Sequence, residues 1–205
     1  MNNKIFLCSA AAFVASSFQL KAKSIEPDRP NILWLTFEDT SWFEFGCYGN
    51  NQVSTPVIDE LAEHGVQFMN ASSVAPQSSP ARSSLITGSY ATSYAMDLHP
   101  VPFDTPEGIF FPQYLRDAGY YCTNNSKTHY NTTVNHKGFW DESNKDASYN
   151  SKSRKDGQPF FAVFNTVTSH MGRIRTHHTD GRRDYTQSGI YPEKLDLPPH
   201  LPDLH

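Results

Sequence analysis

The chain of 205 residues carries a net charge of −4 at pH 7 and has a pI of about 6.1, and its length fits a single globular domain. The sequence has no basic excess that would indicate nucleic acid binding, and it has no acidic tail. Hydrophobic residues make up 38% of the chain, enough for a packed core, and no repeat or low-complexity segment is present. These features argue against a nucleic acid partner and indicate a folded domain.

The first 23 residues are typical of a signal peptide. Lys4 supplies a short positive region, Ile5–Phe18 an apolar region of small residues, and Leu20–Ala22 a plausible processing site. The apolar stretch is too short to span a bilayer, which takes about 20 residues. We therefore expect a periplasmic or secreted protein that does not reside in the membrane, with a mature domain over residues 24–205.

The cysteines give a weak signal about redox state. Cys47 and Cys122 are the cysteines that remain after such processing. Export permits a disulfide, but one of them falls in an expected loop and the other in an expected strand. Two free thiols are therefore the better prediction.

The first half of the chain alternates between strand and helix patterns. The apolar run Asn31–Phe37 predicts a buried parallel strand. Pro56–His64 predicts a helix, with Thr55 as N-cap and proline at its first position. Val66–Met69 predicts a further short strand.

The second half continues the alternation. Helices are expected over Pro80–Thr87 and Gly108–Ala118, each followed by glycine, and strands over Tyr120–Asn124 and Phe160–Val167. The polar stretch Trp140–Gln158 is expected to be a surface excursion. This order predicts an α/β fold in which helices sandwich a mostly parallel sheet. In such folds ligands bind at the carboxyl ends of the strands.

Polar residues follow the predicted strands, at the carboxyl ends where ligands are expected. Glu38 and Asp39 directly follow the first strand, where paired carboxylates suit a hard cation such as Ca²⁺ or Mg²⁺. An isolated acidic pair is more often a helix cap or a solvated turn. Ser78 precedes a helix, whose N-terminal N–H groups and dipole favour an anion such as sulfate, although an ordinary N-cap is the simpler interpretation of Ser78 alone.

Basic residues follow the later strands. Lys127 and His129 alternate along a chain expected to be extended and so are expected to face one side. The lysine suits a sulfate oxygen, and the histidine suits proton exchange near pH 7. His170 follows the strand at Phe160–Val167. Alone, each of these residues would be interpreted as a solvated strand end.

Taken in order, these segments resemble the sulfatase family. Ser78-Ser79-Pro80-Ala81-Arg82 with Leu85-Ile86-Thr87-Gly88 resembles its active-site signature, and Gly119-Tyr120 through Lys127-Thr128-His129 and Phe160-Phe161 through His170 resemble its later segments. The chain departs from the family at Glu38, Ser126 and Ser169, where aspartate, glycine and proline are usual. The overall look is most similar to bacterial exported sulfatases related to heparan N-sulfatase.

The resemblance implies an alkaline-phosphatase-like sulfatase domain in which a radical-type maturase converts Ser78 to Cα-formylglycine. It implies one Ca²⁺ or Mg²⁺ held by Glu38, Asp39 and Ser78, and a sulfated carbohydrate as substrate. A hydroxyl of the hydrated aldehyde would attack sulfur while Lys127 and Arg82 offset the charge.

By the same resemblance, His170 or Lys127 would protonate the departing sugar oxygen. His129 would take the proton of the second hydroxyl, so that sulfate leaves as the aldehyde reforms. An unmodified serine has no second hydroxyl and would retain the sulfate. Pro80 and Arg82 argue against a related phosphatase with an unmodified nucleophile.

The family's second acidic pair has no counterpart after His170, so residues 24–205 are expected to be the N-terminal portion of a truncated catalytic domain. The alternative is an inactive remnant or a fragment that binds sulfated glycans through a basic loop at residues 173–183. A zinc site built from His129, His136, His170, His177 and His178 is disfavoured, since none of these histidines shows a helical spacing with a companion glutamate.

Overall fold

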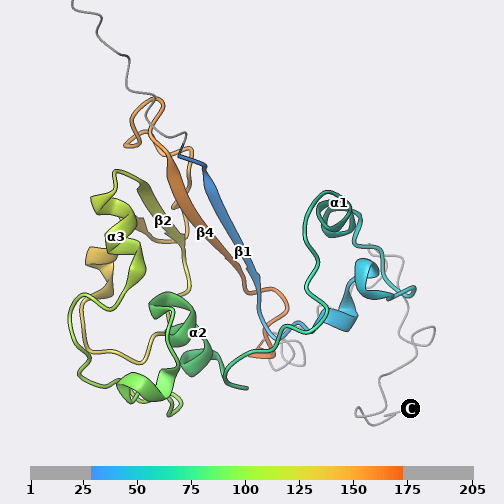
Figure 1. Cartoon of the computed structure of the whole chain (residues 1–205), viewed down its shortest axis with the longest axis horizontal. Coiled ribbons are helices and arrows are strands. Elements are labelled where there is room, and N and C mark those ends of the chain that lie inside the picture. The colour runs from blue at the N-terminus through green and yellow to red at the C-terminus, as the bar shows by residue number, and fades with distance from the viewer. Residues whose placement is uncertain (1–28, 173–205) are drawn as a thin grey trace, which may run out of the picture.

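The computed structural model describes residues 29–172, which form a parallel four-stranded sheet with helices (Figure 1). The strands are β1 (Ile32–Phe37), β2 (Tyr121–Asn125), β3 (Glu142–Ser143) and β4 (Phe160–Thr166). The helices are α1 (Pro56–His64), α2 (Ser78–Thr87) and α3 (Phe111–Asp117), with short 3₁₀ turns η1 (Trp42–Glu44), η2 (Gly46–Tyr48), η3 (Ala91–Tyr94) and η4 (His136–Phe139). The predicted α/β class with parallel strands is confirmed.

The sheet order is β1-β4-β2-β3, so β4 lies between the two other long strands. β1 runs parallel to β4, with Ile32 opposite Phe161 and Phe37 opposite Thr166. Each of the predicted long strands is found within one residue of its expected bounds. These runs are apolar and rich in aromatic and branched residues, a composition that suits a pleated surface covered by other elements.

Helices α2 and α3 cover one face of the sheet. Trp34 of β1 stacks on Phe111 of α3 at 6.0 Å, and Phe161 of β4 lies 5.4 Å from Phe111 between ring centroids. Phe110 and Phe161 are almost fully buried in this cluster. Burying a side chain of this size contributes about 1.5–3 kcal/mol, so this aromatic layer holds α3 against the sheet.

A loop covers the other face of the central strands. Tyr149 stacks on Phe160 at 4.9 Å, and Ala147 is completely buried. The expected surface excursion is therefore wrong in part, because it contributes β3 and the buried Trp140 to the fold. The same face of β1 is less covered, and its outward side chains remain exposed, namely Leu33, Leu35 and Phe37.

Several boundaries differ from prediction for local reasons. Helix α2 begins at Ser78, two residues earlier than expected, and ends at Thr87, where it is capped by Gly88, whose φ of 66° is left-handed and favours glycine. Helix α3 begins at Phe111 and not at Gly108, which has a φ of 81°. The strand expected at Val66–Met69 is absent, since these residues have no neighbouring strand to pair with in the described part of the chain.

Helix α1 lies apart from α2 and α3 in Figure 1 and packs against η2. Cys47 and Cys122 are both free thiols, as predicted. Among residues 29–172, no helix is both long and apolar enough to cross a bilayer. The expected signal peptide and the basic loop at residues 173–183 lie outside the described residues.

Candidate functional site

The polar residues singled out in the sequence gather where β1, β4 and β2 end and α2 begins. Glu38 follows β1 directly, and Lys127 comes two residues after β2. Ser169 follows β4, and its hydroxyl donates to the backbone carbonyl of Glu38. The carboxyl edge of the sheet therefore collects them, as expected for a parallel α/β protein.

Ser78 is the first residue of α2, which places it in a helix and not before one. The first backbone N–H groups of any helix have no partner within it, so this end of α2 suits an anion. The Ser78 Oγ atom is buried and has no hydrogen-bond partner in the protein. A buried hydroxyl without a partner is uncommon and costs free energy, and Ser78 shares this feature with Ser84 of the same helix.

Ser78 lines a cavity of about 430 Å³ together with Glu38, Asp39 and Arg82. These four residues come from the end of β1 and the first turns of α2. The cavity thus joins two carboxylates, one guanidinium and the unpartnered hydroxyl. Such a space can accept a small anion, a hard cation or both.

Glu38 is the central charge of the site. Its side chain is 7% exposed, and its Oε2 atom lies 2.6 Å from Lys127 Nζ. Its Oε1 atom lies 3.5 Å from Arg82 Nη1. A buried carboxylate needs paired charges to offset its desolvation, and here two cations from different elements provide them. Glu38 therefore holds the ends of β1, β2 and α2 together.

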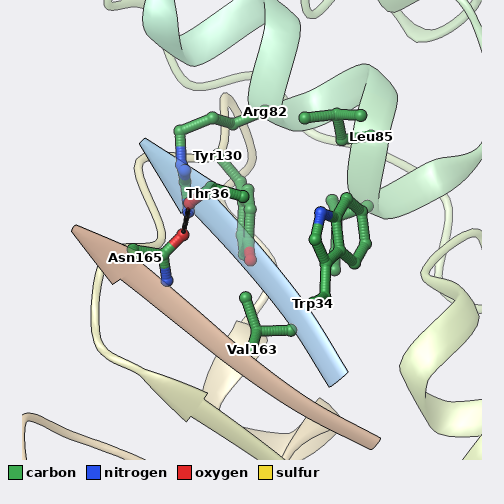
Figure 2. Close-up of a pocket in the computed structure, with 8 residues that line it drawn as sticks. Trp34, Thr36, Arg82, Leu85, Tyr130, Val163 and Asn165 are labelled. Atoms are coloured by element: carbon green, nitrogen blue, oxygen red, sulfur yellow. Dashed lines mark hydrogen bonds between the residues drawn. The ribbon is translucent and has the colours of Figure 1, made fainter. Parts of the chain in front are cut away.

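Arg82 crosses from α2 to the sheet, as Figure 2 shows. Its Nε donates to the Thr128 carbonyl at 2.8 Å and its Nη2 to the Lys127 carbonyl at 2.6 Å. Nη2 also donates to Asn165 Oδ1 at 2.9 Å. The planar guanidinium is suited to such multiple bonds. Arg82 consequently fixes the segment that carries Lys127.

Asn165 of β4 is a residue that the sequence interpretation missed. Its Oδ1 accepts from Arg82 and, at 2.8 Å, from Thr36 Oγ1 (Figure 2). Its Nδ2 donates to Asn124 Oδ1 at 3.0 Å and to the Asn125 carbonyl at 3.2 Å. An amide side chain in an otherwise apolar strand was the signal available, since a buried polar group must find partners.

The segment after β2 bends at Ser126 and is not an extended strand, which corrects the expected basis for placing Lys127 and His129 on one side. His129 has a φ of 51°, in the left-handed region that residues other than glycine rarely adopt. Lys127 points to Glu38, while the His129 ring packs against His99 at 5.3 Å between centroids.

The charge around His129 favours its neutral form. Burial lowers the pKa of the His129 imidazole first, and the nearby positive groups of Lys127, His99 and Arg82 lower it further, while Glu38 opposes them. A neutral imidazole is the form that accepts a proton. His129 is thereby suited to act as a base at neutral pH.

Asp39 also has a left-handed backbone, with a φ of 48°. Its Oδ2 accepts a hydrogen bond of 2.7 Å from the Met171 backbone N–H. Positive φ at two site residues, Asp39 and His129, is a departure that costs on the order of 1 kcal/mol each and that clusters at functional sites.

His170 lines a neighbouring cavity of about 280 Å³ together with Lys127, Val167 and Gly172. Its Nδ1 accepts from the Gly172 backbone N–H at 3.0 Å. The Glu38–Lys127 ion pair joins this cavity to the one at Ser78. The structure therefore brings Lys127 and His170 together on one side of Glu38, while His129 lies outside the linings of both cavities.

The donor set at the Ser78 cavity fits a hard cation in kind. Two carboxylates and a hydroxyl are oxygen ligands of the type that Ca²⁺ and Mg²⁺ prefer, and the Ser78 hydroxyl is without a protein partner. Lys127 and Arg82 already face the Glu38 carboxylate, so a cation would compete with them. Within residues 29–172 no group of three or more His, Cys, Asp or Glu side chains is placed to hold a metal.

The fold and the site together define a parallel α/β protein with a polar site at the carboxyl edge of its sheet. Residues 30–189 match the sulfatase family, and the chain belongs to this family of hydrolases.

The relatives are sulfatases, and several of them are named for a carbohydrate. The chain is 34% identical over 194 residues to an ulvan-active sulfatase of Formosa agariphila, a match that covers 82% of this chain and 32% of that protein. It is 31% identical over 104 residues to an N-acetylglucosamine-6-O-sulfatase of Bacteroides thetaiotaomicron, covering 51% of this chain and 18% of that protein. The chain thus spans about a third or less of the length of these relatives.

The fold is shared with a solved structure, that of BT4656 in complex with its substrate D-glucosamine-2-N,6-O-disulfate. The two superpose with a TM-score of 0.59 and 21% identity, over 69% of this chain and 35% of that chain. At this identity the likeness shows the fold alone.

Proposed function

We propose that this chain carries the nucleophile of an exported hydrolase that releases sulfate from a sulfated carbohydrate. The observation that carries the proposal is the Ser78 hydroxyl, buried without a partner at the N-terminal end of α2 and facing a cavity with Glu38, Asp39 and Arg82. Family membership and the names of the relatives support this substrate class.

In this proposal a radical-type maturase oxidises the Ser78 side chain to an aldehyde, removing two hydrogen atoms. Hydration of the aldehyde gives two hydroxyls on one carbon. One hydroxyl attacks the sulfur of the substrate, and the sugar oxygen departs. The second hydroxyl then gives up its proton, so that sulfate leaves by elimination and the aldehyde reforms.

The surrounding side chains serve these steps. Arg82 and Lys127 are the cations placed to offset the sulfate charge, and Lys127 or His170 would donate the proton to the departing sugar oxygen. His129, held neutral by its surroundings, would accept the proton of the second hydroxyl. A Ca²⁺ or Mg²⁺ held by Glu38, Asp39 and residue 78 would make the attacking hydroxyl more acidic.

The modification itself is the first test. The chain is produced together with a radical-type maturase, and the peptide that contains residue 78 is examined by mass spectrometry and by reaction with a hydrazide. The proposal expects a peptide lighter by two hydrogen atoms that forms a hydrazone. An unmodified residue 78, under conditions in which the maturase converts a reference peptide, would overturn it.

Turnover is tested with sulfated N-acetylglucosamine and sulfated ulvan oligosaccharides, with free sulfate as the readout. Ser78→Ala should abolish release without a loss of stability, because the Ser78 hydroxyl makes no hydrogen bond in the protein. Ser84→Ala is the matched control, since it removes another buried and unpartnered hydroxyl from the same helix. Binding of the sulfated oligosaccharides without release, by a fully converted chain, would instead favour the glycan-binding alternative.

A further inference from the structure

A second histidine stands beside the proposed base. His99, which follows η3 in the chain, packs its ring against His129 with centroids 5.3 Å apart and the planes at 71°. The two residues are 30 positions apart in sequence. No motif in the sequence joins them, and the functional roles proposed above do not use His99.

The His99 ring is anchored to the start of α2. Its Nδ1 atom lies 2.7 Å from the Ser79 hydroxyl, which belongs to a fully buried residue next to Ser78. A buried hydroxyl needs a partner, and this imidazole provides one. The hydrogen bond fixes the position of the His99 ring, and the hydroxyl can serve either as its donor or as its acceptor.

The backbone on both sides of the contact is tied to the same helix. Asn131, only 2% exposed, donates through Nδ2 to the carbonyls of Met96 and Leu98, just before His99. Its own N–H donates to the Ser83 hydroxyl of α2 at 2.9 Å. Asn131 lies two residues after His129. It therefore ties the segment that carries His129 and the segment that carries His99 to each other and to α2.

His129 itself has few other restraints. Its left-handed backbone sets the direction of its Cα–Cβ bond, but a partly exposed imidazole can still rotate about its side-chain torsions. The His99 ring, which packs against the His129 ring at a steep angle, restricts this rotation. The contact with His99 is the ring contact that the structure provides for His129.

We infer that His99 is a positioning residue for His129: Ser79 fixes the His99 ring, and the His99 ring holds the His129 imidazole in one orientation. The inference deepens the proposed function, on which the role of His129 as a base rests. The charged groups that act on His129 are Lys127, Arg82 and Glu38, and His99 is the group that packs against its ring.

The test observes the His129 ring directly in the unmodified chain. Histidine ring resonances are assigned by NMR and titrated in the wild type, in His99→Asn and in Ser79→Ala. His99→Asn keeps an amide able to bond Ser79 but removes the ring. We expect this variant to lose the fixed pattern of nuclear Overhauser effects from the His129 ring and to raise the His129 pKa, because one neighbouring imidazole is gone.

Ser79→Ala should shift the His129 resonances in the same direction to a smaller extent, since the His99 ring remains but loses its anchor. His64→Asn, which removes an exposed histidine at the end of α1, is the control and should leave the His129 resonances unchanged. Backbone spectra verify that each variant is folded, and if Ser79→Ala is not, His99→Asn decides.

His129 resonances, Overhauser effects and pKa that are the same in folded His99→Asn as in the wild type would overturn the inference. This outcome is independent of the proposed function, because the measurement needs neither formylglycine nor a cation nor a substrate. Conversely, failure of Ser78 to be converted would leave the Ser79–His99–His129 result unaffected.

Discussion

Removing the charge of Glu38 should destabilise the fold far more than removing a surface charge. At an effective dielectric constant of about 20, a carboxylate 2.6 Å from Lys127 Nζ and 3.5 Å from Arg82 Nη1 gains about 6 and about 5 kcal/mol of gross attraction. Desolvation offsets most of this. Removing one partner of a buried ion pair lowers the free energy of unfolding by about 3–5 kcal/mol, because the other charge stays buried without compensation.

The expected result for Glu38→Gln is therefore a fall of about 3 kcal/mol in the free energy of unfolding, measured by urea titration with far-UV circular dichroism. Glu63→Gln, an exposed residue on α1, is the control and should change stability by less than about 0.5 kcal/mol. Adding Lys127→Met to Glu38→Gln should cost little or restore stability, since the lysine has already lost its partner.

The double-mutant cycle isolates the pair. We expect a coupling energy between Glu38 and Lys127 of at least about 1.5 kcal/mol. Additive effects of the two substitutions, or a loss below about 0.5 kcal/mol for Glu38→Gln alone, would refute the view that Glu38 is the electrostatic centre of the site.

Three further outcomes follow from the structure. Burial and Lys127 lower the pKa of His129 below its ordinary value of 6.5. The native state therefore binds fewer protons than the unfolded state, and the free energy of unfolding falls as pH drops below 6.5. This decline should be smaller in His129→Asn, and an equal decline in the variant would contradict the prediction. Burial raises the pKa of the Cys122 thiol to about 12, so iodoacetamide should label Cys47 in the native protein and Cys122 only in denaturant, as peptide mass spectrometry can check. Ala95→Gly should raise the free energy of unfolding by about 1 kcal/mol, because alanine there has a φ of 55°; an unchanged urea midpoint would count against left-handed strain.

The sequence was sufficient for the strands and for the residues that follow them. Apolar runs such as Ile32–Phe37 have a composition and length typical of a strand in a parallel sheet, and the polar residue after such a run is placed by the sheet itself. Glu38, which directly follows β1, was therefore predictable in position. The strand expected at Val66–Met69 was wrong, because apolar character alone does not supply a neighbouring strand.

The connections inside the site were not predictable in the same way. Asn165 and His99 act through hydrogen bonds and ring contacts to residues 20 to 129 positions away, and no local periodicity reports such pairings. Likewise β3 has two residues, Glu142 and Ser143, and a pair cannot display a period. The contacts of Asn165 and His99 and the pairing of β3 all depend on the tertiary fold and not on a local sequence pattern.

The burial of the segment around Ser78 limits when a modifying enzyme can reach it. Ser79 and Pro80 are fully buried, and the Arg82 side chain is 11% exposed. An enzyme that reads these residues as a linear signal finds them hidden once α2 has docked on the sheet. Under the proposed maturation, folding and oxidation are competitors, and the chemical fate of each molecule is decided while the segment is still open.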